Sequence, residues 1–215
     1  EEIARTAFAL CAEADVSYPG KLLAGQQEIF ALMMKKGVNC PLSSGMGRLF
    51  DGVWSLLSGE LRAGYEGAGA AALEALARKT KENDEAYAVD FVQEHELLRW
   101  DTRSMIRAIC ADMETLLPEE IALRFHNTVV RYGVESCEYV RKQTGLNRVV
   151  FSGGSFFNRI LAKKLKKELE LRGFSVFRHH RVSPGDEGIA LGQQAIAAHF
   201  GKEGNIRVSG STSEN

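Results

Sequence analysis

A glycine pair that follows a short apolar run is the first feature able to do chemistry. The loop Ser152-Gly153-Gly154-Ser155 follows the run at 148–151 and precedes a helical pattern that begins at Phe156. Backbone amides in such a loop, with the positive end of a helix dipole, suit a phosphate or another anion, although paired glycines also occur in tight turns without a ligand. Asn158 then either directs its amide toward that anion or lies on the surface.

Asp186 is a second candidate, in the loop Pro184-Gly185-Asp186-Glu187-Gly188 before the last predicted helix. It either caps that helix or serves as a hard ligand for a divalent metal ion. A metal site needs further ligands, and the five histidines show neither HxxxH nor HxH spacing. The sequence therefore contains no complete metal site.

Two further acidic positions stand beside glycine turns. Asp51 follows the small-residue loop at 43–47, and Glu66 with Gly67 precedes an alanine-rich segment. A carboxylate in such a place can accept hydrogen bonds from both hydroxyls of a ribose, or it can simply be solvated. The lysines at 163, 164, 166 and 167 lie on an amphipathic segment and are predicted to form a solvated helix face.

The elements that must position these residues follow from periodicity and from glycine and proline breaks. The first forty residues show two apolar helical stripes, one with Ile3, Ala7 and Phe8 and another with Ile29 and Phe30. Further along the chain, helices are predicted at 49–57, 70–79, 102–113, 118–145, 156–172 and 189–200, a hairpin at 87–92 and 97–100, and strands at 148–151 and 174–178. This order predicts a helix-rich α/β fold with a small mixed sheet and functional loops at strand ends.

Composition narrows the class of protein. The chain has 215 residues, 45% hydrophobic and 26% charged, which excludes disorder, collagen and coiled coil. The 27 basic residues nearly balance 28 acidic ones, so nucleic acid is not an expected partner. No apolar run reaches the roughly 18 to 20 residues of a membrane span, and we expect a cytoplasmic protein with no membrane contact. Its four cysteines lack a CxxC pair and are expected to be reduced thiols.

Four segments together resemble one known family. They are 43–53 (SSGMGRLFDGV), 65–74 (YEGAGAAALE), 151–159 (FSGGSFFNR) and 184–193 (PGDEGIALGQ). In this order they resemble the C-terminal part of the HypF family, the carbamoyltransferases of NiFe-hydrogenase maturation. The likeness runs from about residue 39 to residue 199.

The resemblance implies a fold of the actin and sugar-kinase (ASKHA) type, in which two lobes close on a nucleotide. Residues 1–200 look like the second, C-terminal lobe of the last HypF domain, and residues 201–215 look like a flexible tail. In the family, preceding domains convert carbamoyl phosphate and ATP to carbamoyl adenylate. The last domain then passes the carbamoyl group to the C-terminal cysteine of HypE, where it becomes a cyanide ligand of the hydrogenase.

The resemblance also assigns roles to single residues. Gly153, Gly154 and Asn158 match positions at the adenylate phosphate, and Asp51 with the turn at Glu66 and Gly67 matches positions facing the ribose. Asp186 matches a carboxylate that shares one divalent metal, iron or zinc, with two histidines of an HxxxH motif in the other lobe. Because that motif is not in this sequence, the fragment is expected to be inactive alone.

Three residues depart from the family pattern. Ser155 and Phe157 replace the Val and Gln of the usual Gly-Gly-Val-Phe-Gln-Asn motif, and Glu187 replaces a second glycine after the metal-binding aspartate. Glu187 either alters the choice of metal or points outward. Alternatives to a HypF lobe are a related antibiotic O-carbamoyltransferase, a threonylcarbamoyl-tRNA enzyme, or a docking lobe without catalysis. The sequence begins without Met inside a helical pattern, which we expect of a piece of a longer protein.

Overall fold

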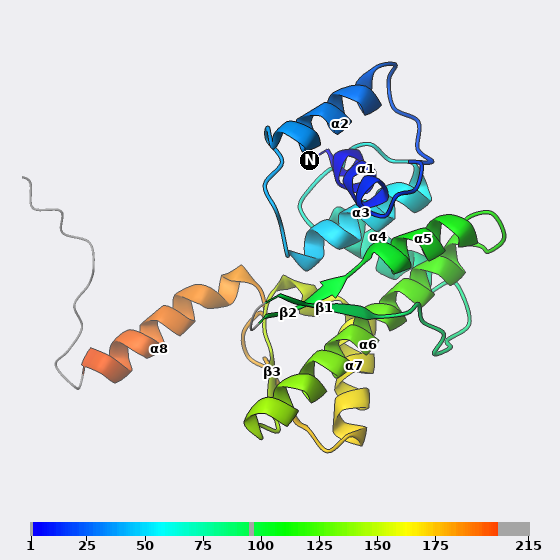
Figure 1. The fold of residues 1–215 in the computed structure, drawn as a ribbon. Helices are drawn as coiled ribbons and strands as arrows, with labels where there is room; N and C mark the ends of the chain where they lie inside the picture. The colour runs from blue at the N-terminus through cyan, green and yellow to red at the C-terminus, as the bar shows by residue number, and fades with distance from the viewer. Residues whose placement is uncertain (1, 95–96, 202–215) are drawn as a thin grey trace, which may run out of the picture.

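The computed structural model describes residues 2–94 and 97–201, which form a helix-rich α/β structure (Figure 1). The N-terminal half contains α1 (Ile3–Glu13), α2 (Gln26–Lys36), α3 (Met46–Ser58), α4 (Ala68–Ala77) and the strands β1 (Asp90–Glu94) and β2 (Leu97–Asp101). The C-terminal half contains α5 (Arg103–Asp112), α6 (Pro118–Thr144), β3 (Arg148–Phe151), η1 (Gly154–Phe157), α7 (Arg159–Leu171), β4 (Ser175–Arg178), η2 (Asp186–Gly188) and α8 (Ile189–Gly201).

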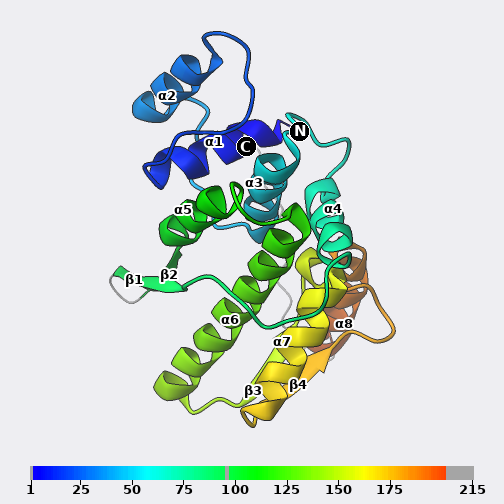
Figure 2. The ribbon, with the colours of Figure 1, turned by 90° about the vertical axis from the view of Figure 1, so that its right-hand side faces the viewer.

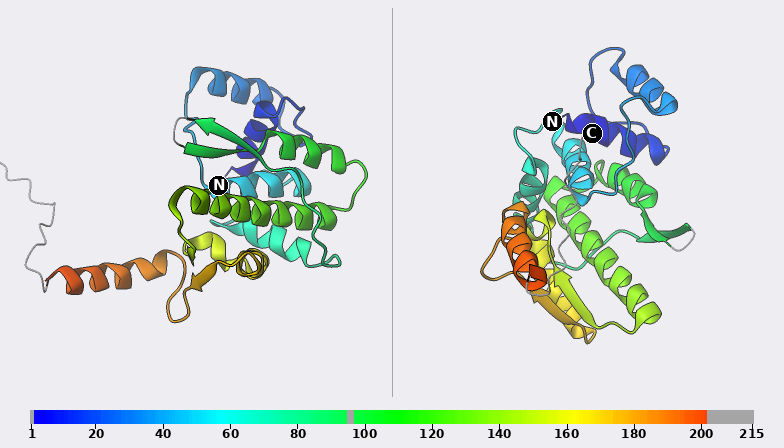
Figure 3. Two further views of the ribbon diagram at one scale, coloured as in Figure 1. Left: turned by 60° about the horizontal axis from the view of Figure 1, so that its bottom comes forward. Right: turned by 90° about the vertical axis from the view of Figure 1, so that its left-hand side faces the viewer.

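The main core lies where α1, α3, α5 and the first half of α6 meet. Its fully buried side chains include Ala7 of α1, Val53 of α3, Ile109 of α5 and Phe125 of α6. Within each of these helices the buried residues recur at helical spacing, so each helix packs one apolar face against the same core. By contrast α2 stands outside α1 (Figure 3, right) and buries none of its residues. Its predicted apolar stripe is only partly covered: Phe30 and Met34 pack against the edge of the core, while Ile29 and Leu32 are exposed.

The long helix α6 contributes to both hydrophobic cores. Pro118 opens it at the first helical position, and the Glu120 side chain accepts a hydrogen bond from the Leu117 amide at 3.0 Å. Gly145, in the left-handed conformation, ends it as predicted. One part of α6 lies in the main core, while Val134 contributes to a second, smaller core with Phe151 of β3 and Leu169 of α7.

The strands lie in two pairs in the described residues, so the predicted small mixed sheet is divided between them. The hairpin β1–β2 is antiparallel, with Phe91 opposite Trp100. The pair β3–β4 is parallel, with Val149 opposite Val176, and α7 connects its two strands. Because the strands run in the same direction, the loops that follow them emerge at one edge. Those are the loops that contain Gly153 and Asp186.

The α/β prediction is confirmed, and the differences are local. The hairpin begins at Asp90 rather than at residue 87, and the helix predicted from Phe156 begins at Arg159, after the short turn η1. The buried Lys164 contradicts the prediction that all four lysines of this helix are solvated. The tail predicted from residue 201 lies outside the described residues, apart from Gly201 at the end of α8.

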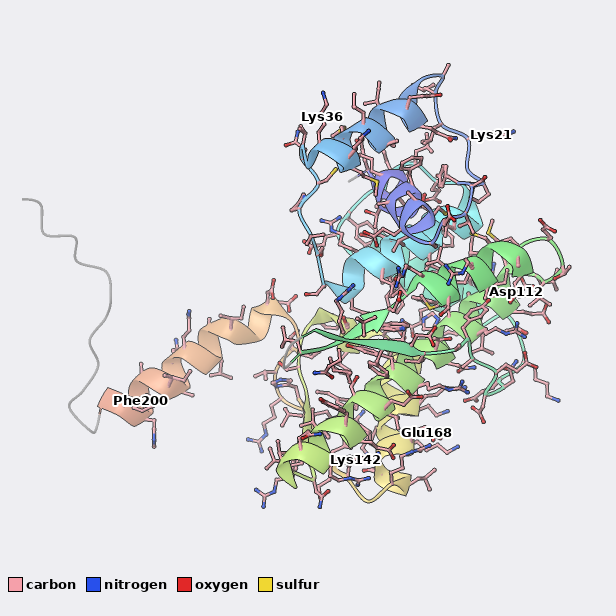
Figure 4. The ribbon with its side chains drawn as sticks, in the orientation of Figure 1. Lys21, Lys36, Asp112, Lys142, Glu168 and Phe200 are labelled. Atoms are coloured by element: carbon pink, nitrogen blue, oxygen red, sulfur yellow. The ribbon has the colours of Figure 1, made fainter. Side chains whose placement is uncertain are left out.

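The last helix, α8, projects from the rest of the chain (Figures 1 and 3, left). Phe200 lies near its far end (Figure 4), and Ile189, Leu191 and Ile196 are also exposed. Among the helices of the described residues, none is both long and apolar enough to cross a membrane.

Candidate nucleotide and metal-binding loops

The loops after β3 and β4 are joined by a direct hydrogen bond. The Gly153 amide donates to the Pro184 carbonyl oxygen at 2.7 Å, which ties the glycine pair to the loop that contains Asp186. On the same edge, His179 Nε2 lies 3.4 Å from the Ser152 hydroxyl oxygen. The structure thus brings together Gly153, Gly154 and Asp186, which are separated by more than thirty positions in the sequence.

The backbone conformation of the glycine loop explains why residue 153 is a glycine. Gly153 has φ 101° and ψ 158°, a region that only glycine occupies without strain. The chain then enters η1 at Gly154. In the described part of the chain, the amides of Gly154 and Ser155 donate no hydrogen bond. They are the donors that this loop can offer to an anion.

Two amides at the N-terminus of α7 have acceptors within the protein. Asn158 is the N-cap of this helix, and the Asn158 side-chain oxygen accepts a hydrogen bond from the Leu161 amide at 3.1 Å. Helix α4 lies beside the start of α7 (Figure 2), and its Glu74 side chain accepts a hydrogen bond from the Arg159 amide at 3.0 Å. A carboxylate and an amide oxygen thus stabilise the positive end of α7.

Asn158 itself is neither on the surface nor turned toward the loop. Its side chain is only 7% exposed, and its amide nitrogen lies 2.9 Å from Nε2 of His126 on α6. Both ends of the amide are therefore engaged within the protein. The alternative that Asn158 lies on the surface is wrong, and its contact with a phosphate stays a prediction.

Asp186 lies at the exposed tip of its loop, at the start of η2. Its side chain makes no hydrogen bond within residues 2–94 and 97–201, and the N-cap of η2 is Gly185, so Asp186 does not cap a helix in this structure. Glu187, beside it, accepts a hydrogen bond from the Ser183 hydroxyl at 2.7 Å, and this bond lowers the pKa of Glu187. Glu187 is thus held against its own loop, while the carboxylate of Asp186 is open to a ligand.

A complete metal centre is not formed by the described residues. They contain no group of three or more His, Cys, Asp or Glu side chains arranged to hold a metal ion. Asp186 fits the role of one hard oxygen ligand because its carboxylate is exposed and makes no hydrogen bond or ion pair within residues 2–94 and 97–201. Further ligands would have to come from outside these described residues.

Asp51 is buried where α3 crosses α4. It is 6% exposed, and Arg48 lies 3.6 Å from it on the same helix. A side-chain carbon at Gly69 of α4 would stand 2.8 Å from a carboxylate oxygen of Asp51, so glycine is needed for this close approach. The interpretation of Asp51 as a solvated carboxylate is therefore wrong.

Glu66 and Gly67 lie at the start of α4, a few residues from Gly69. Gly67 has φ 82° and caps the helix, while Glu66 is exposed. The same helix reaches α7 through Glu74. Helix α4 thus connects the predicted ribose positions with the end of the glycine loop.

Positive charge gathers beside the glycine loop. A depression of about 750 Å³ lies along α7, and its lining includes Arg159 and Lys163 of that helix, Phe156 of η1 and Arg178 of β4. Cations at this place favour the approach of an anionic ligand to the loop.

Sequence reasoning missed two buried polar residues. His126 is fully buried on α6, and Lys164 of α7 donates to the Asn83 carbonyl oxygen at 2.6 Å and to the Asn127 side-chain oxygen at 2.8 Å. A signal for Lys164 exists in the sequence, because it lies three residues after Leu161 on the apolar face of the helix. His126, which has only its place in an apolar helical stripe, could not be connected with Asn158.

Comparison with known proteins decides the family. A family model described as "Carbamoyltransferase, Kae1-like Domain, second subdomain" of HypF matches residues 1–193. The chain belongs to the HypF carbamoyltransferase family. Its matching part is the second subdomain of the HypF Kae1-like domain, an ASKHA-related fold.

Individual HypF proteins agree with this assignment. Carbamoyltransferase HypF2 of Cupriavidus necator is 31% identical over 195 residues, covering 77% of this chain and 23% of the relative. Carbamoyltransferase HypF of a Synechocystis strain is 32% identical over 153 residues, covering 71% of this chain and 19% of the relative.

One solved structure is similar to this chain over its whole length. It is a crystal structure of full-length HypF in the phosphate- and nucleotide-bound form, with TM-score 0.84 and 30% identity, covering 100% of this chain and 28% of the HypF chain. The chain thus spans between 19% and 28% of the length of these relatives.

Proposed function

We propose that this subdomain takes part in the carbamoyl transfer performed by a HypF-type enzyme. It would bind carbamoyl adenylate and help to pass the carbamoyl group to the C-terminal cysteine of HypE. The 2.7 Å hydrogen bond from Gly153 to Pro184 carries the proposal, because it holds the proposed anion-binding loop next to the loop of the proposed metal ligand Asp186. The family assignment and the similarity to a phosphate- and nucleotide-bound HypF support it.

The proposed reaction is an acyl transfer to a thiolate. The sulfur of the HypE cysteine attacks the carbamoyl carbon and forms a new S–C bond. The bond between that carbon and the phosphate oxygen of the adenylate breaks, and AMP leaves with the electron pair. The protein must therefore stabilise negative charge on the carbamoyl oxygen and on the departing phosphate.

The two loops are placed to share these tasks. The amides of Gly154 and Ser155 would hold the phosphate, and the nearby cations of the depression along α7 would add to the attraction. Asp186 would be one ligand of an iron or zinc ion, with two histidines of another lobe as its companions. Such a metal supplies Lewis-acid polarisation of the carbamoyl oxygen when bound.

The experiment uses a full-length enzyme that contains this subdomain, with HypE, ATP and labelled carbamoyl phosphate. Asp186→Asn is compared with Glu187→Gln, a matched control at the next position whose carboxylate is held by Ser183. We expect Asp186→Asn to lose bound metal and to lower transfer of label to HypE by a factor of about 10² or more, while Glu187→Gln retains both. The isolated chain should not transfer the label.

Carbamoyl-phosphate-dependent exchange between ATP and pyrophosphate serves as the internal reference, since preceding domains would catalyse it. Exchange that continues while transfer stops places the defect after adenylate formation. Unchanged transfer and unchanged metal content in Asp186→Asn would contradict the metal role.

A further inference from the structure

His126 lies beneath the glycine loop, completely enclosed by protein. It is 0% exposed, and its ring packs edge-on against Phe50 and Phe125, with centroids 5.4 Å and 5.9 Å away. A polar ring in such a place must satisfy both nitrogens inside the protein. Nδ1 lies 2.7 Å from the Ala122 carbonyl oxygen, and Nε2 lies 2.9 Å from the side-chain nitrogen of Asn158.

These two contacts fix where the proton of the ring is. A carbonyl oxygen can only accept, so Nδ1 carries the hydrogen and donates it to Ala122. In the neutral ring Nε2 is then an acceptor, and it receives a hydrogen bond from the Asn158 amide nitrogen. This arrangement determines the orientation of the Asn158 amide: its nitrogen faces His126 and its oxygen faces the Leu161 amide.

Asn158 transmits this orientation to the glycine loop. It directly follows η1, and its own amide donates to the Ser155 carbonyl oxygen at 3.3 Å. Its side-chain oxygen holds the first turn of α7. Asn158 therefore sets the angle at which the turn from Gly154 to Phe157 joins α7.

We propose that His126 is a positioning residue for carbamoyl transfer: it orients the Asn158 amide, and through Asn158 it holds the turn whose amides receive the adenylate phosphate. This inference rests on the proposed function of that turn. It gives His126 no contact with the substrate.

The proposal predicts that the ring must remain neutral. A protonated ring would direct an N–H at the Asn158 NH₂ group, and relief by rotation of the amide would remove the acceptor from Leu161. Burial lowers the pKa of His126; the hydrogen bond to the Ala122 carbonyl oxygen and the charge of Glu74 raise it, and Lys164 and Arg78 lower it, with a net lowering. These three charged groups come from α4, its C-terminal end and α7, so the neutral state is favoured by the surroundings of the ring.

The test compares two substitutions of His126 in a full-length enzyme. His126→Phe keeps the ring volume between Phe50 and Phe125 but loses the acceptor, whereas the oxygen of Gln in His126→Gln can still accept from Asn158. We expect single-turnover transfer of carbamoyl to HypE to fall roughly 10- to 100-fold in His126→Phe. His126→Gln should recover most of this loss.

Two controls separate positioning from general stability. Ile109→Val, a buried change on α5, lowers stability without touching the turn and should leave the transfer rate of the folded enzyme unchanged. Transfer should also decline more steeply at acid pH in the wild-type protein than in His126→Gln, because protonation of His126, below its ordinary pKa of about 6.5, adds to the protonation of the HypE thiol that both proteins share.

Wild-type transfer rates in His126→Phe would overturn the proposal, as would an equal loss in His126→Phe and His126→Gln, or an acid decline equally steep in the wild-type protein and in His126→Gln. The comparison with Asp186→Asn keeps the two hypotheses apart. If Asp186→Asn abolishes transfer while His126→Phe does not, the proposed function stands and the role of His126 fails.

Discussion

Replacing Gly153 with alanine should destabilise the chain far more than the same change at Gly154. Gly153 has φ 101° and ψ 158°, and an L-residue held there costs about 1–3 kcal/mol. For a chain of this length, that corresponds to a fall in the melting temperature of about 2–12 °C. Gly154 has open space around an added side-chain carbon and no strained φ, so Gly154→Ala should stay within about 0.5 kcal/mol of wild type.

The stabilities of Gly153→Ala and Gly154→Ala are compared by thermal and urea unfolding under identical conditions. The destabilisation by Gly153→Ala has an upper limit, because the variant can relieve its backbone strain by rotating the peptide. That rotation would break the hydrogen bond to the Pro184 carbonyl oxygen. Such relief would release the Asp186 loop, and hydrogen exchange at residues 185–188 would become faster. Equal stability of the two variants would show that the loop does not need glycine at position 153 for its backbone conformation.

Two further predictions concern buried polar contacts. Lys164→Met should cost about 1–3 kcal/mol in urea unfolding, because it leaves the buried side-chain oxygen of Asn127 without its donor. Lys163→Met, on the exposed side of α7, should cost less than about 0.5 kcal/mol, and similar values for both would count against a role for Lys164 in stability. Burial and the hydrogen bond to Asp112 raise the pKa of Tyr87, so in the unfolded chain its phenol ionises first and stability should fall above about pH 10; Tyr87→Phe should weaken that fall, and an unchanged alkaline profile would contradict it.

Local patterns in the sequence were sufficient to predict most of the fold. The hairpin, α6 with its proline start and glycine end, and the order of β3, α7 and β4 all follow from periodicity and breaks within each segment. The start of α7 was misplaced by three residues because Ser155 to Phe157 continue a helical pattern, while only Asn158 forms the cap. The exposed face of α2 was not predictable, since an apolar stripe does not say what will cover it.

The candidate site was predictable where the loops themselves carry the residues. Gly153, Gly154 and Asp186 lie at one edge, as expected of loops that follow parallel strands. The contacts that were not predictable are those whose partners come from distant helices. Asn158 is held by His126, and the N-terminus of α7 by Glu74, and neither contact leaves a spacing signal in the sequence.

The Gly153 turn and the Asp186 loop are proposed to form one nucleotide-binding surface. Amide hydrogen exchange of the full-length enzyme, with and without saturating ATP and carbamoyl phosphate, tests it residue by residue. We expect slower exchange at 153–157 and 185–188 together, with no change in α2 at Gln26–Lys36. Protection of only one loop, or of neither while the enzyme is demonstrably forming carbamoyl adenylate, would contradict it.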